Sequence, residues 1–215
     1  MKKKYETGIE TRKLILKESR KLFLEKGFRN TSYDDICKAA HVNRGSIYYH
    51  FKQKDNLRYE ILWDLFFEYK KEAASYTAVS SEQYIFTLYL IWNKILTDKE
   101  IGRFFIDYYT DFPVYSPDKE LSIFITTLYK NCYNDILPLS EIDLFDLASM
   151  YGYLGCISQM VKQMPGKFSI DTLFPNILSC CFRILRLPQD RTEPLLQSLS
   201  EIIARYQEAV VFSQT

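Results

Sequence analysis

The sequence predicts an all-α protein of about ten helices, with a small N-terminal three-helix domain followed by a larger helical domain. Three observations predict this fold class. The 215 residues include only seven glycines and seven prolines, so few turns interrupt the chain. Apolar residues recur at intervals of three and four along most segments, which is the spacing of one helix face. Apolar residues also make up 47% of the chain, which is enough to fill a sizeable core.

The first helix is expected from about Ile9 to Lys26. Four residues share its inward face: Ile15, Ser19, Leu22 and Phe23. Gly27 follows at the position where a glycine commonly ends a helix, so we expect the chain to turn there.

The stretch from Asn30 to Phe51 reads as two short helices joined by a tight turn. Thr31 and Ser32 can cap the first of these helices. Asp34 or Asp35 then lies close to the spacing that completes a capping box. This pattern predicts that the first short helix begins after Thr31 or Ser32.

The turn at His41 leads into the second short helix, Arg44–His50, for which Asn43 is a suitable cap. Ile47 and Phe51 are one turn apart and can face inward. The outward side carries polar side chains and no acid, namely Asn43, Arg44, Ser46, Tyr48, Tyr49 and His50. Such a face suits the major groove of DNA. An ordinary helical hairpin with a solvated polar face would show the same pattern.

The formal net charge of +1 hides an asymmetry along the chain. Residues 1–59 carry 15 Lys and Arg against 7 Asp and Glu, whereas residues 60–215 carry 13 against 20. The basic charge therefore coincides with the helix-turn-helix pattern, as expected of a surface that binds phosphate.

A long helix is expected from Lys54 to about Tyr76, because apolar residues recur there at helical spacing. It leaves the basic part and enters the acidic part, so we place the domain boundary at its start, between residues 1–55 and 56–215. Six further helices are expected at Ser81–Thr97, Lys99–Phe112, Ser116–Leu137, Ser140–Gln163, Ser169–Leu187 and Thr192–Phe212.

The second domain is rich in aromatic residues, with 12 Tyr, 12 Phe and both Trp from Glu60 onward. Aromatic walls with a few hydroxyls are a common pocket chemistry. Candidate residues for a ligand pocket are Trp63, Phe67, Tyr89, Trp92, Phe105, Tyr108, Tyr109 and Tyr151. The alternative is that they only fill the core. Asp107 and Asp111 could face a cationic ligand, although a solvated helix face explains them equally well.

A set of ordered positions resembles the N-terminal signature of TetR-family transcriptional regulators. The resemblance extends over residues 9–62 and is carried by Ile15-Leu16, Leu22-Phe23, Gly27-Phe28, Thr31-Ser32, Asp35-Ile36, Ala39-Ala40, Val42, Gly45, the run Ile47-Tyr48-Tyr49-His50-Phe51-Lys52 and Lys54-Asp55-Asn56-Leu57. It implies an all-α homodimer in which residues 1–55 bind DNA. Residues 56–215 would then bind a ligand, form the dimer and control the affinity for an operator.

The resemblance also implies which residues contact DNA. The expected contacts are Thr31 and Tyr33 on phosphates, Asn43, Arg44, Gly45 and Tyr48 in the groove with Ser46 beside them, and Tyr49, His50 and Lys54 on flanking phosphates. Arg44 can pair bidentately with guanine, and Gly45 lets the backbone approach DNA closely. Two departures from the family pattern are His41, where glycine is common, and Ser19, where alanine is usual.

A stripe of mostly small residues follows one face of the helix expected at Ser140–Gln163, and in most soluble chains such a stripe is internal packing. The family resemblance instead implies that this helix and the next pair with their copies in a four-helix dimer interface. The residues expected there are Ala148, Gly152, Gly155, Gln159, Ile177 and Cys181.

The five cysteines form no C-x-x-C pair, which fits reduced thiols in a cytoplasmic protein. Cys180-Cys181 could be a redox sensor, although buried core cysteines are the simpler explanation. No metal site, cofactor site, catalytic motif, signal peptide or membrane-spanning segment is expected.

The function predicted from these observations is a repressor that a small hydrophobic or aromatic ligand releases from a palindromic operator. One alternative is the same DNA-binding head with a filled core, controlled by a protein partner. A remoter alternative is a small-molecule binding protein whose head no longer reads DNA.

Overall fold

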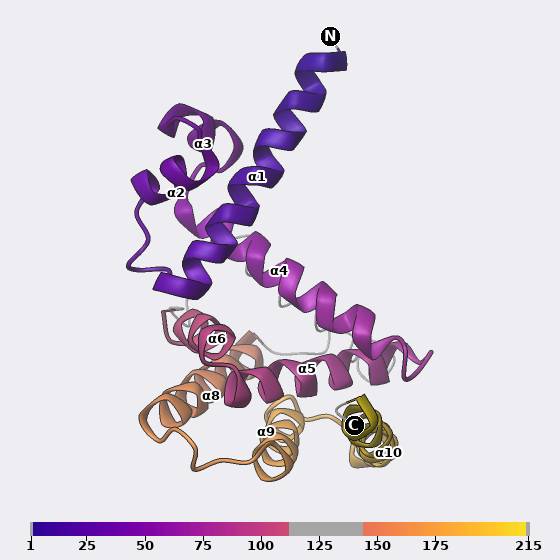
Figure 1. The fold of residues 1–215 in the computed structure, drawn as a ribbon. Coiled ribbons are helices and arrows are strands. Elements are labelled where there is room, and N and C mark those ends of the chain that lie inside the picture. The colour runs from indigo at the N-terminus through magenta and orange to yellow at the C-terminus, as the bar shows by residue number, and fades with distance from the viewer. Residues whose placement is uncertain (1, 112–143, 214–215) are drawn as a thin grey trace.

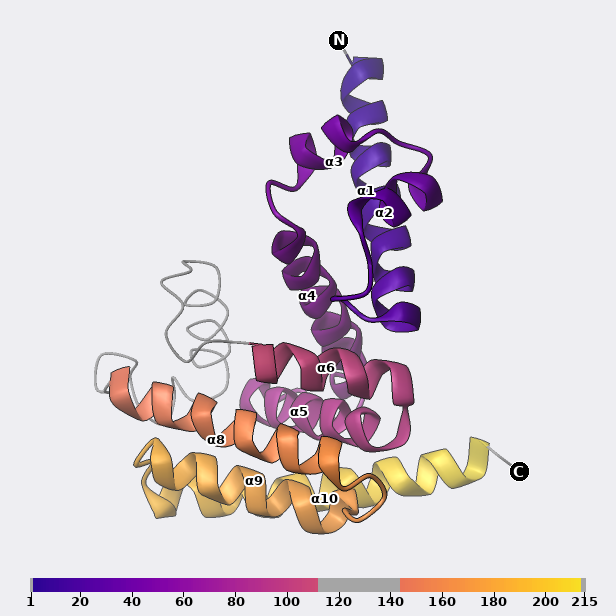
Figure 2. The same ribbon diagram turned by 90° about the vertical axis from the view of Figure 1, so that its left-hand side faces the viewer.

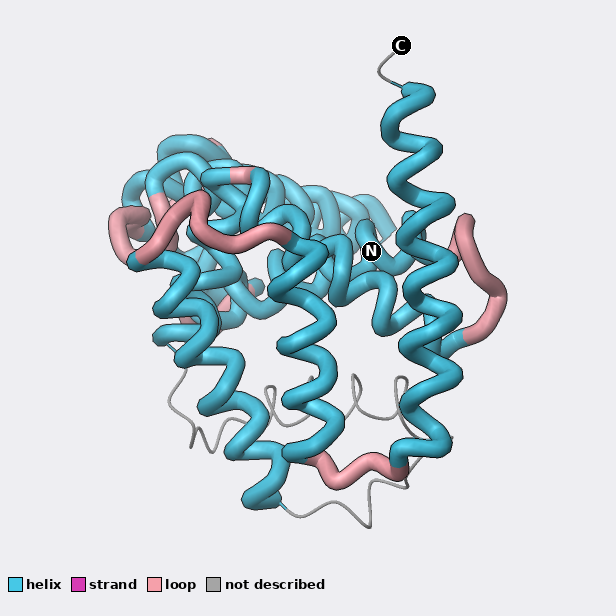
Figure 3. Tube along the Cα trace, turned by 90° about the horizontal axis from the view of Figure 1, so that it is seen from below, coloured by secondary structure: helices cyan, strands magenta, loops and turns pink. Residues whose placement is uncertain are grey.

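The structure is a computed structural model that describes residues 2–111 and 144–213. All regular elements in these two ranges are helices (Figures 1 and 3), which confirms the predicted all-α class. They are α1 (Lys2–Lys26), α2 (Tyr33–Ala40), α3 (Arg44–His50), α4 (Lys54–Ala73), α5 (Ser80–Thr97), α6 (Lys99–Asp111), α8 (Leu144–Gln163), α9 (Ile170–Ile184) and α10 (Gln189–Ser213). The helix predicted at Ser116–Leu137 lies outside the described residues.

Helices α1 to α3 form the head of the molecule, at the top of Figures 1 and 2. The inward face predicted for α1 is confirmed, because Ile15, Ser19 and Phe23 are fully buried. Ile36 of α2 and Ile47 of α3 meet this face and are also fully buried. Helix α1 ends at Lys26 as predicted, and Gly27 follows with a φ of 92°.

Helix α4 connects the head to the remaining helices, and it packs against both α1 and α5 (Figure 1). Two ion pairs join α1 to α4, Arg12 with Glu60 and Arg20 with Glu68. They lie about two turns apart on both helices, so they brace the head along the length of α4.

Helices α5 to α10 form the core domain, and α5 is its central element (Figure 2). Helices α4, α6, α9 and α10 all contact α5. The prediction of a nearly all-round apolar helix here is confirmed, because α5 is buried from Tyr84 to Trp92 apart from the half-buried Leu88. Within the described ranges, no helix is both long enough and apolar enough to cross a membrane.

Where the predicted start lies in the described ranges, two helix starts differ from the predictions by more than one residue. Helix α1 begins at Lys2 rather than Ile9, because its first turns rest on helix-forming lysines that leave no apolar pattern. Helix α10 begins at Gln189 rather than Thr192, because the Pro188 carbonyl already accepts a hydrogen bond from the Thr192 amide at 3.1 Å.

Candidate nucleic-acid interface

The helix-turn-helix is held by local hydrogen bonds at its two helix starts. The Ser32 hydroxyl accepts from the Asp35 amide at 3.1 Å, and the Asp35 carboxylate accepts from the Ser32 amide at 2.8 Å, which confirms the predicted capping box. His41 adopts the left-handed conformation at the turn, with a φ of 52°. The Asn43 side-chain oxygen accepts from the Ser46 amide at 2.8 Å and caps α3. The sequence therefore fixes the geometry of this motif locally.

Helix α3 buries one face in the head and presents the other to solvent. Ile47 and Phe51 are buried on the inward side, as predicted. On the outward side Arg44 and Tyr48 are exposed, and Tyr49 is the most exposed of these side chains at 83%. A polar face held on such a small, firmly packed domain can reach a partner without any rearrangement of the backbone.

Aromatic contacts order the side chains of this surface. The Tyr33 ring of α2 lies 5.1 Å from the Tyr48 ring, and the Tyr49 ring lies 4.9 Å from the imidazole of His50. The structure thus brings together the tyrosines that were predicted as phosphate and groove contacts.

Gly45 lies next to the cap of α3. A Cβ at this position would lie 3.2 Å from the Asn43 side-chain oxygen, which is tighter than an ordinary contact. Glycine therefore keeps the cap uncrowded, besides leaving room for close approach of a partner.

Helix α3 itself carries no acid, as predicted, but an acid of the neighbouring helix reaches its outward surface. Asp34 of α2 accepts two hydrogen bonds from Arg44, from Nε and from Nη2, both at 2.9 Å. These hydrogen bonds lower the pKa of Asp34 and raise the pKa of Arg44. The prediction concerned α3 alone, and the acid comes from the helix before the turn.

Two residues predicted at phosphates use their side chains inside the head, which corrects their assignment. Thr31 is buried, and its hydroxyl donates to the carbonyl oxygens of Gly27 at 2.9 Å and of Leu22 at 3.3 Å. The Lys54 ammonium donates to the carbonyl oxygens of Phe28 at 2.9 Å and of Thr31 at 3.0 Å. Burial lowers the pKa of Lys54. Both side chains tie down the loop between α1 and α2.

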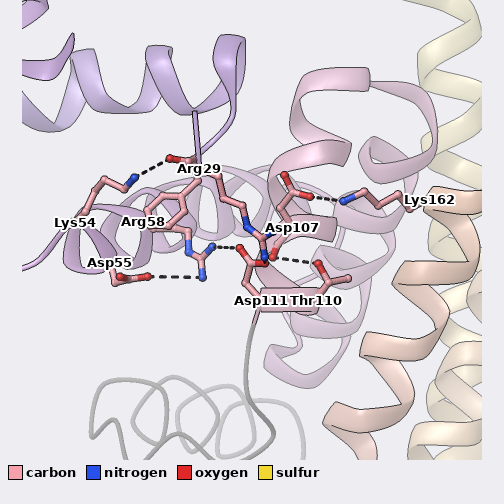
Figure 4. Close-up of polar contacts among 9 residues, drawn as sticks. Arg29, Lys54, Asp55, Arg58, Asp107, Thr110, Asp111 and Lys162 are labelled. Carbon is pink, nitrogen blue, oxygen red and sulfur yellow. Dashed lines mark hydrogen bonds and ion pairs between the residues drawn. The ribbon is translucent and has the colours of Figure 1, made fainter. Parts of the chain in front are cut away.

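A second polar cluster joins the head to the core domain (Figure 4). Arg58 of α4 donates to Asp111 of α6 at 3.0 Å, and Arg29 of the α1–α2 loop pairs with the same carboxylate. One turn earlier on α6, Asp107 pairs with Lys162 of α8 at 2.6 Å. The hypothesis that Asp107 and Asp111 face a cationic ligand is therefore wrong, because the chain's own cations occupy both carboxylates.

The Arg58 guanidinium also lies between two rings, 4.2 Å from the centroid of Phe28 and 5.3 Å from that of Tyr108. Arg103 of α6 donates to the Leu24 carbonyl at the end of α1. The roles of Arg58 and Arg103 could not be predicted from the sequence, because their partners lie more than 50 residues away and no local spacing reveals them.

Most of the described residues that were predicted to line a ligand pocket belong to the hydrophobic core or pack against it. Tyr89 and Trp92 are buried on α5, where Tyr89 stacks on the Phe86 ring at 5.7 Å. Phe105 and Tyr108 are buried on α6, and Tyr108 faces the Arg58 cluster. On α4, the half-buried Trp63 stacks with Phe67, whose side chain is exposed, which corrects the placement of Phe67 in an internal pocket. The side chains of Tyr109 and Tyr151 lie outside the described part of the structure.

The residues predicted at a dimer interface also divide in two. On α8, Gln159 is exposed, and a Cβ added to Gly152 would meet no atom within 4 Å. Gly155 is half-buried, and the side chain of Ala148 lies outside the described part. On α9, Ile177 and Cys181 are buried in the core of the single chain. Their assignment to an interface is therefore corrected, because they already pack within one subunit.

The neighbouring cysteines of α9 have different surroundings. Cys180 is half-buried, and Arg183 donates to its sulfur at 3.1 Å. A hydrogen bond with Tyr153, together with Arg183, lowers the pKa of Cys180. Burial raises the pKa of Cys181 to about 12. The four described cysteines are all free thiols, and no group of three or more His, Cys, Asp or Glu side chains in the described ranges could hold a metal ion. Cys132 lies outside those ranges.

Comparison with known proteins finds a family match over the helix-turn-helix. A family model described as bacterial regulatory proteins, tetR family, matches residues 15–61. The HTH-type transcriptional regulator AcrR of Shigella flexneri is 50% identical over 56 residues, which are 26% of this chain and 26% of AcrR. The regulator QacR of Staphylococcus aureus is 42% identical over 48 residues, which are 22% of this chain and 26% of QacR. The chain thus matches these relatives over about a quarter of their length.

A likeness to solved structures extends beyond the head. The crystal structure of RolR in complex with resorcinol aligns with 84% of this chain and 88% of its own, at a TM-score of 0.55 and 17% identity. At this identity the likeness shows the fold alone. It agrees with the predicted arrangement of a helix-turn-helix head on a larger helical domain.

Proposed function

We propose that the chain is a sequence-specific DNA-binding transcriptional regulator of the TetR family, since the family model and the curated relatives match its helix-turn-helix. The family and the matched relatives are transcriptional regulators rather than enzymes, in agreement with the prediction of no catalytic activity. We place its action in the cytoplasm, where the DNA of a bacterium lies.

The observation that carries the proposal is the outward face of α3. Arg44, Tyr48 and Tyr49 project from a rigid, capped helix into solvent. The part of the chain that holds them has 15 basic against 7 acidic residues over positions 1–59. Excess positive charge around an exposed polar helix supports binding to phosphate, and side chains of this kind can read base edges in the major groove.

The proposed regulator is a homodimer that binds a palindromic operator. A dimer of helix-turn-helix domains reads two half-sites about 34–36 Å apart, or a multiple of that distance. The open surface at Gly152 and the exposed Gln159 support α8 as part of the contact between subunits. Small residues there let a second helix approach closely.

The proposed regulation is release from the operator by a small aromatic molecule. The aromatic side chains of α5 and α6 support this class of effector, and the fold of RolR holds resorcinol in its solved complex. A movement of α6 would reach α4 through the pair of Asp111 with Arg58, and it would reach α1 through the hydrogen bond from Arg103 to the Leu24 carbonyl. A differential affinity of about 1–3 kcal/mol between two states changes operator affinity by about 5–150-fold.

Selection from a randomised DNA pool with the wild-type protein tests the proposal. We expect a palindrome to be enriched, to bind one dimer, and to lose affinity steeply as salt is raised. Arg44→Ala should weaken binding to this fragment about tenfold or more, because a bidentate base contact is lost. Lys71→Ala is the matched control, since it removes one positive charge at an exposed position in the last turn of α4.

Two results would contradict the proposal. One is a pool in which no sequence is enriched, and the other is equal binding by Arg44→Ala and the wild type. Release of the selected fragment by small phenols, with resorcinol tried first, tests the effector separately.

A further inference from the structure

Arg44 has a defined orientation on the surface although little of the protein covers it. Its side chain is exposed, and so is that of Asp34. The two form a bidentate pair in which Nε and Nη2 of Arg44 donate to the two carboxylate oxygens, both at 2.9 Å. Parallel hydrogen bonds of this kind fix the plane of the guanidinium as well as its position.

Asp34 contacts only one edge of the Arg44 guanidinium, and the opposite edge points away from this carboxylate. An arginine has five N–H groups, and Asp34 takes the edge formed by Nε and one N–H of Nη2. One N–H of Nη1 and the other N–H of Nη2 remain side by side on the far edge. These two donors match the O6 and N7 acceptors that guanine presents in the major groove. Arg44 can therefore hold Asp34 and read a guanine at the same time.

We propose that Asp34 is a specificity-determining residue that acts by positioning Arg44 for a guanine. The inference rests on the proposed function, since it concerns how the same surface selects DNA. A pre-positioned arginine loses less conformational freedom on binding its base than a mobile one does. The carboxylate also repels phosphate, so it lowers affinity for DNA of any sequence. Both effects raise the ratio of specific to non-specific binding.

The test begins with the selected operator fragment and a set of fragments in which each base pair of the half-site is changed in turn. Arg44→Ala identifies the position that Arg44 reads, because the base preference is levelled there. At that position Asp34→Asn should reduce the preference for guanine by about threefold to tenfold. The matched control is Asp35→Asn, which removes the same charge one residue away. Asp35 accepts from Ser32 and Lys26 rather than from Arg44, and asparagine keeps an acceptor for the Ser32 amide.

Both asparagine variants should bind a non-specific fragment more tightly than the wild type, and only Asp34→Asn should lose base preference. Asp34→Ala should reproduce that loss, and thermal unfolding followed by circular dichroism checks that the variants fold. An unchanged guanine preference in Asp34→Asn would overturn the inference. It would also be overturned if Arg44→Ala left the base preference unchanged at every position of the half-site. If the wild type selects no operator at all, it is the proposed function that fails.

Discussion

In the head, Arg44 and Asp34 form their pair at the surface, where the two side chains are 56% and 61% exposed. At the junction between head and core domain, Arg58 and Asp111 form theirs where the side chains are only 6% and 13% exposed. A solvated pair can exchange partners readily, because water replaces each lost contact. Removing one member of a buried pair instead leaves a charge without compensation. With the proposed function, the same two residue types would serve DNA recognition in the head, whereas at the junction they hold the head to the core domain.

The contrast extends to the helices that carry these pairs. Helices α2 and α3 are eight and seven residues long and depend on caps and a left-handed turn. The core helices are longer and depend on burial of aromatic side chains around α5. We therefore expect substitutions on the outward face of the head to change binding without unfolding the protein, and substitutions at the junction to change stability.

The largest effect is expected from Asp111→Ala at the junction. This change leaves the buried Arg58 guanidinium with Asp55 at 3.7 Å as its ion-pair partner, besides the rings of Phe28 and Tyr108. Breaking a buried pair costs about 3–5 kcal/mol, and because Asp55 remains, the free energy of unfolding should fall by the lower value of about 3 kcal/mol. Urea denaturation followed by circular dichroism measures it.

Asp107→Ala is the matched control on the same helix. Asp107 pairs with Lys162, whose side chain is 49% exposed, so the cost should be below about 1 kcal/mol. Equal losses in the two variants would show that burial does not distinguish the junction from an ordinary surface pair.

A smaller effect is expected from Gly102→Ala, in the corner between α5 and α6. A Cβ at this position would lie 2.5 Å from the carbonyl oxygen of Ile95, so the backbone must shift. Such overpacking costs about 1–3 kcal/mol, which should appear as a lower midpoint of urea unfolding.

The same substitution in the head, Gly8→Ala, sharpens the comparison. No atom lies within 4 Å of a Cβ added to Gly8 in α1, and alanine favours a helix by up to about 1 kcal/mol. We therefore expect no loss of stability in Gly8→Ala. Equal losses in Gly8→Ala and Gly102→Ala would show that the close contact with Ile95 does not explain the cost at Gly102.

The head could be predicted from sequence because its signals are local. Ser32, His41 and Asn43 act on residues no more than five positions away, so their roles are visible in the printed order. The bounds of α3 followed directly from its cap. Asp34 escaped prediction as a partner of Arg44, because the turn between the two helices decides which side chains meet.

The core domain could be predicted only as a set of helices. Periodicity showed that α5 is buried, but not that Tyr108 lies beside Arg58 or that Phe67 is exposed. Ile177 and Cys181 were assigned to a dimer interface from their position on α9, whereas packing against the rest of the chain buries them. These outcomes depend on contacts between segments far apart in sequence, which composition and spacing do not determine.

The smallest effect concerns two adjacent cysteines, where the contrast between surface and interior recurs within one turn of α9. Only the thiolate reacts with iodoacetamide. The lowered pKa of Cys180 provides more thiolate at a given pH, and the pKa of Cys181, raised to about 12, keeps its thiol neutral. At about pH 8 the native protein should therefore be alkylated at Cys180 and not at Cys181, as peptide mapping would show. Arg183→Ala should slow the reaction at Cys180, because the sulfur loses a hydrogen-bond donor.

The pH dependence has a definite sign for Cys181. Its pKa in the folded protein lies above the value of about 8.5 for an unfolded cysteine. The neutral, buried thiol therefore contributes its full stability below that value, and the contribution is lost as the pH rises towards about 12. Alkylation of Cys181 should begin only at the urea concentration at which the protein begins to unfold. The midpoint of urea unfolding and the midpoint of Cys181 labelling should therefore agree. Labelling of Cys181 at the rate of Cys180 in the native protein would contradict the burial of Cys181 in the core.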